Sequence, residues 1–184
     1  MESGALVMEP ADYDSSQLLT RARDGDLQSF DQIMILHQRR VLHTALRILG
    51  NLQDAQDATQ EVFLRLYKYL NRFDTSRSLS PWLYRLTVNV CHDITKKRPQ
   101  TSELPETLTA PAADHSADIQ IMTQALRKLP EKERSALVLR DIEGLSTKEV
   151  AEILGSTETT VRSQISRARI KLKEFRNRIL RRQL

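Results

Sequence analysis

Apolar residues recur along this chain at the three- and four-residue spacing of amphipathic α-helices. Strand signals are weak throughout, because strict alternation of apolar and polar residues is rare. The clearest helical stretch begins at Asp26 and continues to Leu49, and Gly50 follows as a residue suited to a left-handed helix end. The pattern therefore predicts an all-α fold.

Capping residues and glycine or proline breaks divide the remaining pattern into further helices. In the first half we expect a helix capped within 14–16 and ending near 25, a helix from 51 to about 70, and a helix opened by Ser80-Pro81 that ends at 97. In the second half, one helix ends at 126–129 and another starts at 130–131. A short helix follows the capping box 146–149 and ends at 155, and a last helix runs from 156–158 to about 180.

Residues 99–117 interrupt this helical pattern with three prolines and no periodic face. We interpret them as a flexible acidic linker. A chain of 184 residues then divides into two small helical domains, an N-terminal helical bundle over 1–98 and a C-terminal helix-turn-helix domain over 118–184.

Composition narrows the class of protein. Hydrophobic residues make up 40% of the chain, which is enough for a core and excludes a fully disordered protein. No apolar run approaches the roughly 18 residues that a membrane span needs, and the acidic N-terminal stretch does not resemble a secretory signal, so we expect no membrane insertion. The single cysteine, Cys91, excludes an internal disulfide framework and a multi-cysteine zinc site. We therefore predict a cytoplasmic protein.

The net charge of +4 conceals two basic blocks. Residues 39–98 carry a net charge of +6 and residues 156–184 carry +7, and each block ends a predicted domain. This arrangement suggests two surfaces that meet the same polyanion. Charge alone equally allows two solvated helix faces, so the decision depends on the motifs.

The last two predicted helices have the spacing of a helix-turn-helix. In the final helix, one stripe is apolar and comprises Val161, Ile165, Ala168 and Leu172. The opposite side carries Thr159, Arg162, Ser163, Ser166 and Arg167, and Arg169 extends it. Such a helix can enter a major groove, where arginine binds guanine edges. The alternative is an ordinary amphipathic helix with solvated arginines.

The helix after Pro81 has a second basic face. Its inward stripe comprises Leu83, Leu86, Val90 and Ile94, and the second face carries Trp82, Arg85, Asn89, His92 and Lys96. Aromatic, guanidinium and amide groups on one side suit single-stranded nucleic acid, with Tyr67, Tyr69 and Phe73 upstream as further stacking candidates. The alternative is that the aromatic residues belong to the core.

Three motifs in order resemble the extracytoplasmic-function sigma factors of the sigma-70 family, specificity subunits of bacterial RNA polymerase. The first motif is DAQDATQEVF (54–63), and the second is PWLYRLTVNVCHD (81–93). The third comprises 129–140, 146–151, 160–163 and 167–169. The chain departs from the family pattern at Thr159, where glycine is frequent, and in the loop 78–80.

The resemblance implies a role for each motif. The first would bind the β′ clamp of core polymerase through Asp54, Asp57, Gln60, Glu61, Phe63 and Leu64, with Arg39, Arg40 and Arg47 nearby. The second would melt the −10 element and hold its non-template strand, using Ser78, Leu79, Ser80, Trp82, Arg85, Asn89, His92 and Lys96. The third would bind the −35 element through Thr159, Thr160, Arg162, Ser163, Ser166, Arg167 and Arg169. The resemblance also implies contact with the β flap and control by an anti-sigma factor, in genes of the stress or envelope response.

Two other classes of protein remain as alternatives. A metal-dependent nuclease or recombinase is disfavoured because three acids on one helix make a poor metal site and the histidines lack metal-ligand spacing. We therefore expect no catalytic residues, no metal and no cofactor. A stand-alone helix-turn-helix regulator would bind DNA without polymerase, but the acidic helix and the Trp82 helix would then have no function.

Overall fold

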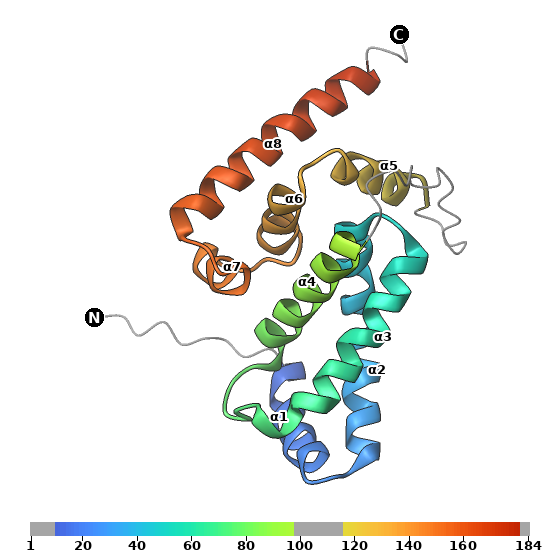
Figure 1. The fold of residues 1–184 in the computed structure, drawn as a ribbon, viewed down its shortest axis with the longest axis vertical. Helices are drawn as coiled ribbons and strands as arrows, with labels where there is room; N and C mark the ends of the chain where they lie inside the picture. Colours follow the sequence, from blue (N-terminus) through green and yellow to red (C-terminus); the bar gives the residue numbers. More distant parts are fainter. Residues whose placement is uncertain (1–9, 98–115, 181–184) are drawn as a thin grey trace.

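The computed structural model describes residues 10–97 and 116–180, and every regular element within these ranges is a helix. The N-terminal half comprises α1 (Pro10–Arg23), α2 (Leu27–Leu49), α3 (Leu52–Tyr69), a 3₁₀ turn η1 (Leu70–Arg72) and α4 (Leu79–Lys97). The C-terminal half comprises α5 (Ser116–Arg127), α6 (Glu131–Leu137), a π-helical turn η2 (Val138–Ile142), α7 (Thr147–Leu154) and α8 (Glu158–Leu180) (Figure 1). The predicted all-α class is confirmed.

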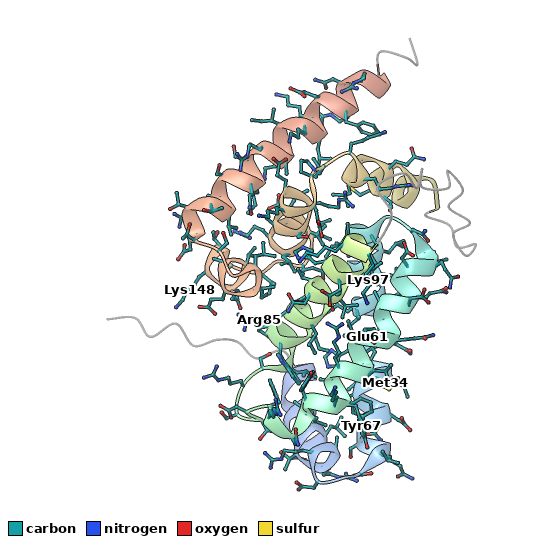
Figure 2. All side chains as sticks on the ribbon, in the orientation of Figure 1. Met34, Glu61, Tyr67, Arg85, Lys97 and Lys148 are labelled. Carbon is teal, nitrogen blue, oxygen red and sulfur yellow. The ribbon has the colours of Figure 1, made fainter. Side chains whose placement is uncertain are left out.

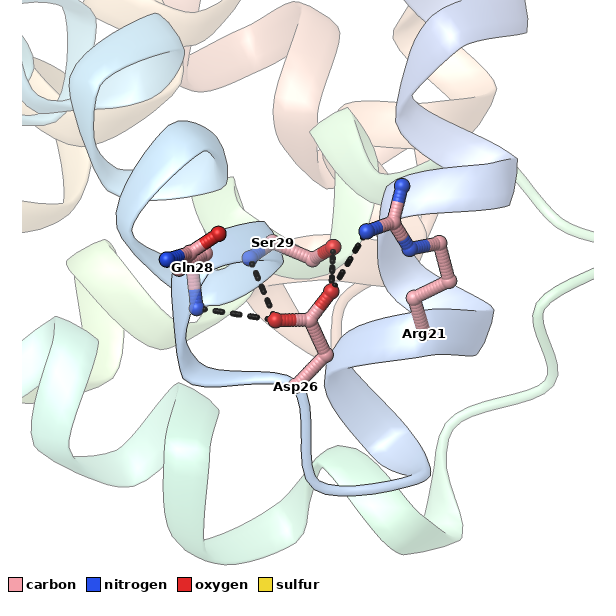
Figure 3. Close-up of polar contacts among 4 residues, drawn as sticks. All are labelled: Arg21, Asp26, Gln28 and Ser29. Atoms are coloured by element: carbon pink, nitrogen blue, oxygen red, sulfur yellow. Dashed lines mark hydrogen bonds and ion pairs between the residues drawn. The ribbon is translucent and has the colours of Figure 1, made fainter.

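Side-chain caps fix the starts of several helices where the sequence predicts them. Asp26 caps α2 and accepts hydrogen bonds from the backbone N–H groups of Gln28 and Ser29 (Figure 3). The Ser29 hydroxyl (2.7 Å) and the Arg21 guanidinium (2.8 Å) also donate to this carboxylate. These contacts, above all the one from the Ser29 hydroxyl, lower the pKa of Asp26. Asn51 caps α3 in the same way.

Three predicted boundaries were wrong by a few residues or more. Helix α1 already begins at Pro10, so the proposed cap at 14–16 lies inside it. Helix α4 begins at Leu79, which places Pro81 inside the first turn, where N–H groups have no partner within the helix. Helix α5 begins at Ser116, so the last two residues of the predicted linker are helical. The rest of that linker lies outside the described residues.

The two halves of the chain pack against each other. In the N-terminal half α2, α3 and α4 lie side by side, with α1 against α2. In the C-terminal half α8 covers α6 and α7. Helix α7 lies beside α4, and α5 and α6 lie beside α2 (Figure 1). The buried residues form one apolar cluster that includes members of both halves, for example Leu83 and Val150.

The turn η2 was not predicted, because its apolar residues continue the period of α6. Its wider winding redirects the chain before the loop that leads to α7. Asp141, within η2, pairs with Arg169 of α8, whereas Glu143, directly after η2, reaches the N-terminal half. This short segment therefore contacts both the last helix and the other half of the molecule.

Candidate nucleic-acid interface

The face of α4 that was predicted to bind single-stranded nucleic acid is largely open to solvent. Arg85, Asn89 and Lys96 are exposed, and Trp82 and His92 are half-buried. Figure 2 shows Arg85 and Lys97 on this helix, toward its beginning and its end. The predicted inward stripe is buried at Leu83, Leu86 and Val90, but Tyr84, Val88 and Cys91 are buried too, because α4 contacts helices on more than one side.

Trp82 borders a cavity of about 680 Å³ at the start of α4. Its ring stacks on Phe73, with centroids 4.6 Å apart and an angle of 16° between the planes. The segment before α4 and α4 itself contribute Tyr69, Arg72, Phe73, Asp74, Arg77, Ser78, Pro81, Trp82, Arg85 and Leu86, and α7 contributes Glu149, Glu152 and Ile153. Aromatic rings suit an unstacked base and guanidinium groups suit its phosphates, so the cavity has the chemistry of a single-strand site.

The structure separates the residues of the loop before Trp82. Ser78 is exposed and lines the cavity. Leu79 is 1% exposed because it begins α4 and packs into the core, so the prediction that it contacts DNA was wrong. Ser80 lines a different, small cavity with His37 and Tyr84.

Two arginines of this cavity were missed in the sequence. Arg72 and Arg77 line it, and Arg72 lies over the Tyr69 ring at 5.7 Å. The available signal was basic residues interleaved with the aromatic residues upstream of Pro81. Of those aromatic residues, Tyr67 does not line the cavity and packs edge-on against Phe30 of α2 instead.

The helix-turn-helix has the predicted local structure. Ser146 and Glu149 form the capping box of α7, and Gly155 ends that helix in the left-handed region with φ of 59°. In α8, Val161, Ile165 and Ala168 are buried. The predicted duplex-binding residues are all exposed: Thr159, Thr160, Arg162, Ser163, Ser166, Arg167 and Arg169.

Neighbouring acids bind three of the arginines of α8. Arg162 donates to Glu158 at 2.8 Å, and Arg169 forms two hydrogen bonds to Asp141 at 2.7 and 2.8 Å. The bidentate contact explains the raised pKa of Arg169. Arg167 lies 3.5 Å from the carboxylate of Glu133. Binding of a phosphate or base by these groups would exchange one acceptor for another.

The acidic motif of α3 faces a groove of about 550 Å³ between α2 and α3. Asp57 and Gln60 line it from α3, and Arg39 lines it from α2. Asp54 is half-buried, and Glu61 is half-buried and accepts a hydrogen bond from Arg65 at 2.7 Å. The motif therefore offers an exposed pair of polar side chains, with the other two partly enclosed.

One further prediction for this surface was wrong, and two of the arginines lie away from the groove. Phe63 is 4% exposed because it packs into the bundle core, so it cannot supply the apolar contact, whereas Leu64 is 65% exposed. Arg40 and Arg47 do not line the groove: Arg40 lines the small cavity near Tyr84, and Arg47 pairs with Glu143. Ile35 and Leu36 of α2 are exposed apolar residues that the sequence pattern did not single out.

Neither metal sites nor membrane spans emerge from the described residues. Within 10–97 and 116–180, no three histidine, cysteine or acidic side chains come together in a way that could hold a metal ion. None of the helices in these ranges combines the length and hydropathy that crossing a bilayer requires.

Two family models match this chain. Sigma-70 region 2 matches residues 34–100, and Sigma-70, region 4 matches residues 119–172. The chain is 33% identical over 171 residues to the RNA polymerase sigma-H factor of Pseudomonas aeruginosa, a match that covers 83% of this chain and 89% of that protein. It is 33% identical over 162 residues to the ECF RNA polymerase sigma factor SigM of Mycobacterium tuberculosis, covering 86% and 82% of the two chains.

Solved structures give the same result. The sigma factor RpoE of Bartonella quintana, solved with the anti-sigma factor NepR, superimposes with a TM-score of 0.71 at 25% identity, covering 80% of this chain and 96% of that one. CnrH, solved with the cytosolic domain of CnrY, gives a TM-score of 0.69 at 27% identity and covers 89% and 97%. The chain therefore belongs to the extracytoplasmic-function sigma factors of the sigma-70 family, transcription initiation factors of the bacterial cytoplasm rather than enzymes or stand-alone regulators.

Proposed function

We propose that this sigma factor divides promoter recognition between the α4 cavity and the exposed face of α8, and that it docks on core polymerase through the groove between α2 and α3. The cavity beside Trp82 takes an unpaired base of the −10 non-template strand, and α8 reads the −35 duplex. The observation that supports this division best is the contrast between the two surfaces. One is a cavity with stacked rings and three arginines, and the other is a convex helix with hydroxyls and arginines.

The polymerase contact follows from the chemistry of the groove. Exposed Asp57 and Gln60 offer acceptors beside Arg39, and Leu64 adds apolar area outside it. This mixture of polar and apolar groups is typical of non-obligate interfaces. Asp57, Gln60, Arg39 and Leu64 would therefore contact the β′ clamp, and the C-terminal half would contact the β flap.

Transcription with purified core polymerase tests this division of labour. We expect Asp57→Ala combined with Gln60→Ala to weaken polymerase binding and leave binding of a −35 duplex by the free chain unchanged. Arg162→Ala should do the reverse and change the preference at one upstream base by about 1–3 kcal/mol. Lys68→Gln and Lys132→Gln, which alter exposed charges outside the groove and outside α8, are the matched controls. If both sets of variants lose the same activity, the division is wrong.

Control by an anti-sigma factor is the second part of the proposal. RpoE was solved with such a partner, and this chain shares its fold over most of its length. A partner that covers the groove between α2 and α3 would compete with core polymerase. Addition of excess core polymerase should then displace it from the chain, and a complex that binds polymerase undiminished would contradict this role.

A further inference from the structure

Three cations of α8 are paired with carboxylates from outside that helix. Arg169 donates two hydrogen bonds to Asp141 of η2, at 2.7 and 2.8 Å. Lys171 donates to one oxygen of Glu133 in α6 at 2.8 Å, and Arg167 lies 3.5 Å from the other oxygen of the same carboxylate. We call the contacts among these five residues the α8 ion pairs.

The paired cations lie on both sides of the helix. At a rotation of about 100° per residue, Arg169 lies on one side of the buried stripe of α8, and Arg167 and Lys171 lie on the other. The face opposite the stripe carries exposed hydroxyl groups at Ser163 and Ser166. A helix in a major groove has a phosphate backbone along each side and base edges in front of it. The paired cations would therefore lie nearest the phosphates, and the hydroxyl groups would lie nearest the bases.

Neither carboxylate releases its cations without cost. The side chain of Glu133 is only 10% exposed, so removal of both its cations would leave a charge with little access to solvent. The side chain of Asp141 is 27% exposed, and its contact with Arg169 is bidentate, a geometry that arginine uses for carboxylate and phosphate alike. A phosphate must therefore displace a protein carboxylate from the same donors, or bind beside it.

The α8 ion pairs affect the part of the DNA affinity that does not depend on sequence. That part comes almost entirely from cations that neutralise phosphates and release counterions. A cation that already faces a carboxylate gains less from a phosphate, because the pair must break or the phosphate must approach the negative charge of the carboxylate. Contacts to base edges do not carry this cost. The two acids would thus lower the affinity for every duplex and leave the difference between sequences unchanged.

We propose that Glu133 and Asp141 limit sequence-independent DNA binding by α8, because they compete with phosphates for the cations on its two sides. The inference rests on the proposed role of α8 in binding the −35 duplex. A genome offers about 10⁶–10⁹ competing non-specific sites. Weaker binding to ordinary DNA therefore leaves more of the chain free to bind core polymerase.

Fluorescence anisotropy of labelled duplex DNA with the full-length chain tests the proposal. Two duplexes of unrelated mixed sequence serve as probes, and each is titrated at several KCl concentrations. We expect Asp141→Asn to tighten binding to both duplexes by about fivefold and to steepen the dependence of log K on log[KCl] by about 1, as one additional phosphate contact would. Glu133→Gln should act in the same direction. Circular dichroism checks that each variant folds.

Two further variants identify the source of the change. Asp31→Asn, at an exposed position of α2, removes one negative charge from the N-terminal half and should alter neither affinity nor slope. Arg169→Gln added to Asp141→Asn should return both quantities to near the wild-type values, because the released cation is then absent.

Three outcomes would overturn the inference. Weaker duplex binding by Asp141→Asn means that this carboxylate positions α8 for DNA and does not limit its binding. Unchanged affinity and slope in both Asp141→Asn and Glu133→Gln mean that the pairs yield to phosphates without cost. A gain that persists after Arg169→Gln is added means that the lost negative charge alone caused it.

The proposed function of α8 fails in a different way. If Arg162→Ala, Arg167→Gln and Arg169→Gln are combined in the otherwise unchanged chain and duplex binding does not weaken, α8 is not the duplex-binding surface. Weakened binding in this variant, together with any of the three outcomes above, would reject the role of the acids and keep α8 as that surface.

Discussion

Gly50 shows how a single residue serves both its own helix and the contact between halves. It ends α2 with φ of 72°, and its N–H donates to the carbonyl of Leu46 at 2.7 Å. A non-glycine residue in this region costs about 1–2 kcal/mol. At Gly50 an added Cβ would also overlap the Cγ and Cδ atoms of Arg127 from α5. Only the first of these demands could be inferred from the sequence.

Gly50→Ala should therefore lower the free energy of unfolding by more than the backbone conformation alone explains. Gly155→Ala is the matched control, because Gly155 also has a positive φ of 59° but has no atom within 4 Å of an added Cβ. We expect a loss of about 1–2 kcal/mol for Gly155→Ala and a further loss of about 1–3 kcal/mol for Gly50→Ala from overpacking. Urea unfolding of both variants measures the difference. Equal losses would show that Arg127 moves aside without cost.

Adjacent residues at the predicted site differ in burial, and the sequence does not specify which of them is buried. Periodicity places Phe63 and Leu64 next to each other on α3, but only the packing of α2 and α4 against α3 decides that Phe63 is core and Leu64 is exposed. Leu79 was misassigned for a similar reason, because α4 begins earlier than Ser80-Pro81 indicates. Polar residues such as Asp57 and Arg85 were placed correctly, since their charge keeps them at the surface.

Among the elements, α7 depends most on its ends. With eight residues it is too short to be stable by itself in water. Its capping box joins the Ser146 side chain to the N–H of Glu149 at 3.2 Å and the Glu149 carboxylate to the N–H of Ser146 at 2.7 Å. Ser146→Ala should lower the stability of the chain by about 1 kcal/mol.

Ser163→Ala is the matched control for this change, because it makes the same replacement at an exposed position inside α8. Alanine favours a helix interior, so we expect no loss of stability there. Thermal unfolding followed by circular dichroism measures both variants. A loss in Ser163→Ala as large as that in Ser146→Ala would rule out the cap as the cause.

The elements also show where prediction from sequence reached its limit. Caps at Asp26, Asn51 and Ser146 are local, since each pairs with an N–H two or three residues away. The sequence predicted the caps at Asn51 and Ser146, and it placed the start of the second helix at Asp26 without identifying the cap. The π-helical turn η2 is not local. Asp141, within this turn, pairs with Arg169, which lies 28 residues further along the chain. The spacing of apolar residues within the segment does not predict the turn.

For the whole molecule, the packing of the two halves against each other was the feature that the sequence predicted least well. A linker rich in proline and acids indicated two separate domains, whereas the hydrogen bond between Thr44 and Glu143 joins residues 99 positions apart. Charge pattern alone does not predict such a contact, because Glu143 lies in a stretch where acids and bases balance. In the structure, the Thr44 hydroxyl, the Arg47 guanidinium and the Tyr84 phenol all donate hydrogen bonds to the Glu143 carboxylate.

Tyr84 connects this packing to pH. Burial raises the pKa of its phenol above the ordinary value, and the facing Glu143 carboxylate raises it further, while Arg40 and Arg47 oppose the shift. A phenol with a raised pKa contributes stability that is complete below the unfolded-state pKa of about 10 and is lost as the pH rises toward the folded-state value. Alkaline solution should therefore lower the stability of the folded chain partly through this one proton.

The contribution of Tyr84 is measurable as a difference between proteins. Between about pH 8 and about pH 11, the wild-type chain should lose more unfolding free energy than Tyr84→Phe, because phenylalanine has no proton to release. Tyr67→Phe removes an exposed phenol and should retain the wild-type loss. Urea unfolding at both pH values compares the three proteins. Equal losses in all three would mean that ionisation of Tyr84 does not oppose folding, and that the side chain contributes to the packing beside Glu143 through its size rather than through its proton.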